Sequence, residues 1–182
     1  MSPTIFAPSS ASTPRLRPEK RTVNARAEAL AVRLERGAEA LAALAMSRTK
    51  CRLNTAIPYD GRTVGVVVHH VASVYPIQIQ LAQTLAAGKP IVGVTMDDVY
   101  AMNAAQAKAN AAVTRDEAVA LLRHNSRLGA FAIRALSGEE LDRANLASLY
   151  SHTPVTCQFV LEDHAVRHSY HHLARIRAVF GA

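Results

Sequence analysis

The chain has 182 residues, of which 49% are hydrophobic and only 5% aromatic, and its formal net charge is +7. This length and composition can bury one globular core, and the abundance of alanine, leucine and arginine favours helices. A basic chain suits nucleic acid. Outside an N-terminal cluster, however, its basic residues are spread along the predicted helices, and no stretch interleaves them with aromatic residues. Because a basic surface alone carries no sequence specificity, we expect no nucleic-acid partner.

The cysteines and the hydropathy pattern exclude two further classes of protein. Cys51 and Cys157 lie far apart and form no CxxC motif, so we interpret both as reduced thiols rather than a disulfide framework. No apolar run approaches the roughly 18 residues that a membrane-spanning helix needs. The N-terminus lacks the charged and then apolar pattern of a signal peptide. We therefore predict a soluble cytoplasmic protein that does not bind a membrane.

The first twenty residues differ from the rest of the chain in composition. They contain four of the eight prolines and many serines and threonines. Such a segment buries too little apolar surface to offset its ordering entropy. We predict a flexible tail over 1–20 and one folded domain over 21–182.

The first predicted helix covers 23–46, where leucines recur at helical spacing, and a loop over 47–62 follows. The next segment, 63–87, is ambiguous because its β-branched valines also suit a strand. Thr63 as an N-cap and the continuing helical periodicity favour a helix. Pro76 would free the carbonyl four residues earlier and kink that helix.

Two more long helices and a short one complete the prediction. A short helix covers 97–111, and Thr114 with Glu117 forms a capping box that opens a helix ending at Ser137-Gly138. That helix carries Val119, Leu122, Leu128, Phe131 and Leu136. The last helix begins near Thr153-Pro154, an N-cap followed by proline at N1, and runs to about Val179 with Phe159 on its inner side. Four long amphipathic helices predict an all-α, up-down four-helix bundle.

Four of the eight histidines lie within nine residues: His164, His168, His171 and His172. On a helix, side chains at i and i+4 share one face, so two imidazoles at that spacing can bind one metal ion. The pairs His164/His168 and His168/His172 both have this spacing. A further ligand must come from another helix, and the adjacent pair His69-His70 is the other cluster. Isolated histidines on a helix are often solvated or structural, so the spacing alone leaves several ligand sets open.

Two segments resemble a known family. Residues 167–176, RHSYHHLARI, resemble the last-helix signature of the DinB/YfiT-like superfamily, which reads H-x-x-H-H with an apolar residue a turn further on. Residues 66–72, VVVHHVA, resemble its second-helix motif, an apolar run that ends in a histidine followed by an aliphatic and a small residue. The separation of about a hundred residues also fits the family. The resemblance covers roughly residues 21–182.

The resemblance implies a four-helix bundle with a three-histidine site for one divalent metal ion. Its ligands correspond to His70, His168 and His172, with His69 and His171 pointing elsewhere. His164, one turn before His168, is then either a residue that supports a ligand or a residue at the rim of the site. The aromatic and acidic residues that often precede the second-helix motif are missing here, where Asp60-Gly61-Arg62-Thr63 stands. Imidazole suits zinc, nickel or iron alike, and the resemblance also implies a homodimer.

Three neutral protein ligands leave a tetrahedral metal ion one open position, as in catalytic sites. The resemblance implies a metal-dependent transferase that joins a low-molecular-weight thiol to an electrophile, or a related detoxification enzyme such as a hydrolase. The alternative is a non-enzymatic, stress-associated metal-binding protein. No general base is evident from the sequence. Glu162 and Asp163, one to two turns before His168, could orient a ligand's second nitrogen, although solvated helix charges are the commoner role for such residues.

Overall fold

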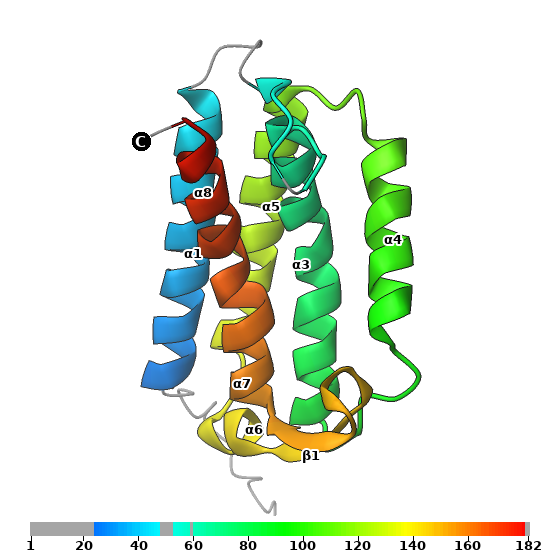
Figure 1. The fold of residues 1–182 in the computed structure, drawn as a ribbon. Helices are drawn as coiled ribbons and strands as arrows, with labels where there is room; N and C mark the ends of the chain where they lie inside the picture. Colours follow the sequence, from blue (N-terminus) through cyan, green and yellow to red (C-terminus); the bar gives the residue numbers. More distant parts are fainter. Residues whose placement is uncertain (1–23, 48–52, 59, 181–182) are drawn as a thin grey trace, which may run out of the picture.

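The computed structural model describes residues 24–47, 53–58 and 60–180, and Figure 1 shows its fold. The predicted tail over 1–20 and Cys51 lie outside the described residues. The central elements are four long helices: α1 (Ala25–Met46), α3 (Val64–Ala86), α5 (Arg115–Arg134) and α8 (Arg167–Phe180). These confirm the predicted all-α four-helix bundle.

The four helices pack in a ring whose order differs from their order along the chain. Helices α1 and α3 each pack against both α5 and α8, so α5 and α8 lie on opposite sides of the bundle. A fifth helix, α4 (Met96–Ala109), lies outside the ring against α3. Because α3 and α8 are neighbours in the ring, the candidate site forms where these two helices meet.

Successive helices alternate in direction along the chain, as an up-down arrangement requires (Figure 1). Helix α4 is one of these alternating helices, although it contributes no buried residue to the core. Within the ring itself, α3 and α5 therefore run in the same direction, and so do α1 and α8 (Figure 1). The peripheral helix thus acts as the return connection between two parallel core helices.

The helix starts follow the capping residues in the sequence. Thr63 begins α3 as its N-cap, so the valine-rich segment is a helix and not a strand. Thr114 and Glu117 form the predicted capping box of α5. A second capping box, formed by Thr95 and Asp98, begins α4. Each threonine side chain accepts a hydrogen bond from a backbone N–H group that the first turn leaves unsatisfied.

The predicted starts and ends around the last helix need correction. Helix α5 ends at Arg134, and Ser137 is the N-cap of a new short helix, α6 (Gly138–Asp142). An antiparallel pair of strands follows, β1 (Ala144–Ala147) and β2 (Thr153–Thr156), joined through the turn η1 (Ser148–Tyr150). Thr153 and Pro154 therefore lie in a strand, where they pair with Ala147 and Leu146. Thr-Pro has the local sequence of a helix N-terminus, but pairing with β1 makes this segment a strand.

The last helical rod begins instead at Thr156, whose side chain accepts a hydrogen bond from the backbone N–H of Phe159. It contains α7 (Cys157–Val160), a π-helical segment η2 (Leu161–Val166) and then α8. Phe159 is 43% exposed and packs edge-on against Tyr150, so its predicted inward position is wrong. Leu128 and Phe131 on α5 are also exposed.

The core is lined mainly by alanine, valine and leucine, with Tyr75 of α3 as its largest fully buried side chain. Among the described residues, α3 alone is long and apolar enough to cross a membrane, and 67% of its most apolar window is buried within the bundle. That burial is typical of the central helix of a folded bundle. Helix α3 also continues through Pro76 from Val64 to Ala86.

Candidate metal centre

The structure brings together His70 of α3 with His168 and His172 of α8. One ring nitrogen from each histidine lies within 4.8 Å of the other two. His70 and His172 are buried, whereas His168 is half-buried. The helices meet here because the apolar faces on either side of these histidines pack into the same core. The three residues that the family resemblance implied as ligands thus converge on one point.

The spacing of the rings fits a shared metal ion. The Nε2 atoms of His70 and His168 lie 3.3 Å apart. Two nitrogens bound to one ion at about 2.0–2.1 Å, with a tetrahedral angle between them, would lie about 3.3–3.4 Å apart. The ring of His172 lies with its centroid 4.8 Å from that of His168 and 5.6 Å from that of His70. Each of the three rings thus offers one nitrogen to the same small region.

The surroundings of the three rings keep them neutral, as metal ligands must be. Burial, together with a smaller effect of the nearby Arg62 charge, lowers the pKa of His70 from 6.5 to about 4. Burial also lowers the pKa of His172 to about 3 and that of His168 to about 2, with the neighbouring histidines adding to the effect. A neutral imidazole offers one lone pair. The cluster therefore presents three available nitrogen donors near neutral pH.

The other histidines lie apart from this cluster. His69 faces away from His70 and lines a surface cavity of about 420 Å³ with Glu117 and Leu121. His171 is exposed beside His172. His164 lies in the π-helical segment, where its Nε2 is 3.0 Å from the Tyr150 hydroxyl. None of these three residues contributes a nitrogen to the cluster of His70, His168 and His172.

A glutamine that the sequence reasoning missed contacts the cluster. Gln78 is 7% exposed, and its Nε2 lies 3.1 Å from His168 Nδ1. It follows His70 by eight residues on α3, and helical spacing places such residues on one face. The sequence signal for Gln78 is therefore a polar residue eight positions after the candidate ligand on the same apolar helix. The Tyr75 hydroxyl also forms a short hydrogen bond with Ser169, which adjoins His168.

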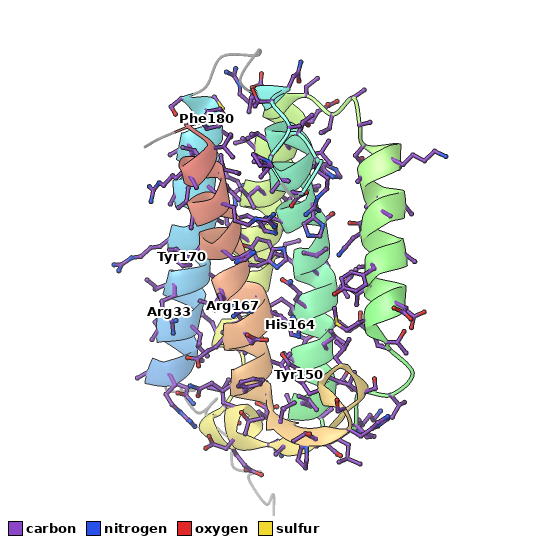
Figure 2. The ribbon with its side chains drawn as sticks, in the orientation of Figure 1. Arg33, Tyr150, His164, Arg167, Tyr170 and Phe180 are labelled. Atoms are coloured by element: carbon purple, nitrogen blue, oxygen red, sulfur yellow. The ribbon has the colours of Figure 1, made fainter. Side chains whose placement is uncertain are left out.

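Asp163 takes a different role from the one considered in the sequence. Its carboxylate accepts a hydrogen bond from the Tyr150 hydroxyl at 2.6 Å and pairs with Arg167 at 3.1 Å. The side chains of Tyr150, His164 and Arg167 lie along the lower part of the last helical rod (Figure 2). Glu162 pairs with Arg33 on α1. Both acidic residues are therefore engaged away from the three-histidine cluster.

A charged group stands where the sequence departs from the family pattern. The side chain of Asp60 is only 4% exposed and pairs with Arg62 and, at 3.2 Å, with Arg175 of α8. Two guanidinium groups thus share one carboxylate, which leaves one positive charge in excess. The Arg62 charge lowers the pKa values of both His70 and His172. This group makes the surroundings of the cluster favourable to anions.

Helix α4 covers the α3 side of the cluster. The hydroxyl of Ser73 lies 3.2 Å from Gln106 Oε1 of α4, and the interaction of the Gln106 side chain with His70 opposes the lowering of the His70 pKa. Cys157 is a free, fully buried thiol, and burial raises its pKa to about 11. These properties suit a core residue and not a reactive thiol.

Comparison with known proteins gives one informative match. No family model matches the chain, and no curated protein matches it. A solved structure described as "YfiT from Bacillus subtilis is a probable metal-dependent hydrolase with an unusual four-helix bundle topology" aligns with a TM-score of 0.68. The alignment covers 91% of this chain and 94% of that one, at 20% sequence identity. The chain therefore has the four-helix-bundle fold of YfiT.

Proposed function

We propose that His70, His168 and His172 bind one divalent metal ion and that the chain is a metal-dependent enzyme. The observation that carries this proposal is the convergence of three neutral nitrogens, two of them at the spacing of a tetrahedral site. When bound, the ion would act as a Lewis acid that makes a nucleophile available near neutral pH. Three ligands leave one coordination position for that nucleophile.

The reaction we propose is the transfer of a low-molecular-weight thiol to an electrophile, in the manner of a detoxification enzyme. The half-buried His168 places the site within reach of a small molecule. The excess positive charge of the Asp60, Arg62 and Arg175 group would attract an anionic thiolate or a substrate carboxylate. Helix α4 would limit the access of water to the α3 side of the cluster.

A metal-dependent hydrolase is the second candidate, because YfiT is described as a probable metal-dependent hydrolase. The same three ligands would serve both reactions, and only the nucleophile differs. In either reaction a proton must leave the nucleophile. His164 lies one turn before His168 on the same rod, and its Nε2 is 3.0 Å from the Tyr150 hydroxyl, which in turn donates to Asp163. We propose this group as the proton acceptor.

Cobalt substitution tests the metal and the thiol together. We expect purified protein to hold about one equivalent of zinc, nickel or iron. In the cobalt-substituted protein, cysteine or 2-mercaptoethanol should add a thiolate-to-cobalt charge-transfer band. Turnover of monobromobimane with thiol, and of p-nitrophenyl acetate without it, then separates a transferase from a hydrolase. The non-enzymatic alternative would be supported by a protein that binds metal but whose cobalt spectrum changes neither with the thiols nor with the two substrates. A protein that binds no metal would refute the proposal.

We also propose that the protein is cytoplasmic and that it forms a homodimer. Sedimentation of the metal-loaded protein at several concentrations measures its oligomeric state. A single species with the mass of one 19.6 kDa chain at all of them would contradict the dimer.

A further inference from the structure

Gln78 is placed to control which nitrogen of His168 carries the proton. Its carboxamide lies 3.1 Å from His168 Nδ1, and the opposite ring nitrogen, Nε2, lies 3.3 Å from His70 Nε2. The side chain of Gln78 is buried, and its Oε1 has no hydrogen-bond partner. One end of His168 therefore faces the proposed metal, and the other end faces a single polar group.

The proton inventory of a neutral imidazole fixes what Gln78 must do. The ring carries one proton, so a His168 that offers its Nε2 lone pair to a metal ion has its proton on Nδ1. That Nδ1–H group needs an acceptor, because a buried donor without one costs about 1–3 kcal/mol. A half turn about the last side-chain bond of Gln78 exchanges its oxygen and nitrogen and places Oε1 opposite Nδ1.

We propose that Gln78 is the positioning residue of this site: its Oε1 accepts the Nδ1–H hydrogen bond of His168 and holds Nε2 toward the metal. The inference rests on the metal binding of the proposed function. A carboxamide also supports the other tautomer, in which Gln78 Nε2–H donates to Nδ1 and His168 Nε2–H donates to His70. Gln78 therefore supports His168 both before and after a metal ion binds.

The other two ligands make this role specific to His168. The Nδ1 atoms of His70 and His172 are buried without a hydrogen-bond partner. Among the three proposed ligands, only His168 has a hydrogen bond to its outer nitrogen, whereas the Gln106 side chain of α4 acts on His70 through its pKa. Such outer partners of metal-binding histidines change metal affinity by about 10–100-fold when they are removed.

Three variants of the full-length chain test the role. Gln78→Met keeps the length of the side chain and removes both polar atoms, so we expect zinc affinity to fall about 10–100-fold. Gln78→Glu offers acceptors only and favours the Nδ1–H tautomer, so its zinc affinity should equal or exceed that of the wild type. Gln80→Met changes an exposed glutamine of the same helix and should leave affinity unchanged. Competition with a chromophoric chelator measures all three dissociation constants.

Long-range proton–nitrogen NMR spectra of the zinc-loaded wild type provide a second readout, because they identify the protonated ring nitrogen directly. We expect His168 to carry its proton on Nδ1. The proposal is overturned if that nitrogen is unprotonated, if folded Gln78→Met binds zinc as tightly as the wild type, or if Gln78→Glu binds it more weakly. A Gln78→Met chain that does not fold leaves the Gln78→Glu variant and the NMR spectra to decide. A wild type that binds no zinc, nickel or iron refutes the proposed function itself, whereas normal metal binding by every variant refutes only the role of Gln78.

Discussion

The side-chain amide of Asn125 on α5 donates a hydrogen bond to the backbone carbonyl of Ala72 on α3, at 2.9 Å. Ala72 lies four residues before Pro76, which has no N–H group to offer that carbonyl. Asn125 therefore replaces the missing helical hydrogen bond from a neighbouring helix. This contact explains how a proline is accommodated inside the central helix, about two turns from His70 and His69.

This relationship predicts a coupled pair of substitutions. Asn125→Leu should lower the free energy of unfolding by about 1–3 kcal/mol, because it leaves a buried carbonyl without a donor. Pro76→Ala restores the backbone N–H, so the loss caused by Asn125→Leu should be smaller in that background. Urea unfolding of the wild type, both single variants and the double variant measures the coupling. Equal losses in the two backgrounds would contradict this account.

The three proposed ligands should differ sharply from their neighbour in sequence. We expect His70→Ala and His168→Ala each to lose the bound metal ion, because two nitrogens remain where a tetrahedral site needs at least three protein ligands. His171→Ala changes an exposed histidine next to His172 and should keep about one equivalent of metal. Elemental analysis gives the metal content, and circular dichroism checks the fold. If His171→Ala lost the metal ion and His168→Ala kept it, the proposed set of ligands would be wrong.

A close approach between α1 and α8 predicts a second coupling. A Cβ atom on Gly37 would lie 2.8 Å from the ring of Tyr170, whose hydroxyl donates to the Arg33 carbonyl (Figure 2). Alanine in a helix interior is otherwise favoured over glycine by about 1 kcal/mol. Gly37→Ala should therefore stabilise a Tyr170→Ala chain more than the wild type. Thermal unfolding of the four chains would show equal gains if the ring moves away freely.

Cys157 predicts a loss of stability in alkaline solution. Burial, with a smaller effect of the Glu140 charge, raises its pKa from 9.0 to about 11 in the folded chain. Between these values the unfolded chain ionises first and binds fewer protons. Stability from this group is therefore complete below about pH 9 and declines toward about pH 11, by at most about 1.4 kcal/mol per pH unit.

Cys157→Ala removes this titration and should flatten that part of the pH profile. Because the substitution also leaves a small cavity, the comparison is between the slopes and not the absolute values. Urea midpoints measured at about pH 8 and about pH 10 give both slopes. Identical slopes in the two chains would show that Cys157 ionises equally in the folded and unfolded states.

The sequence by itself determined the helices that depend on local chemistry. Thr63 and Thr114 cap the first turn of the helices they precede, and the leucine spacing of 23–46 marks a helix with one apolar face. These signals act within a few residues, so no knowledge of the fold is needed to interpret them. The motifs around His70 and His168 also indicated one fold, because their residue patterns resemble those of a known family.

Tertiary structure decided the features that depend on distant partners. Thr153-Pro154 has the local form of a helix start, yet it forms a strand because Ala144–Ala147 is available to pair with it. The partner of His168 is Gln78, ninety residues away in sequence, and not its helical neighbour Asp163, which Tyr150 and Arg167 engage. Hydrogen bonds and charges between helices depend on how the helices pack. Local periodicity therefore identifies the helices that carry the histidine cluster, but only packing identifies the residues that contact it.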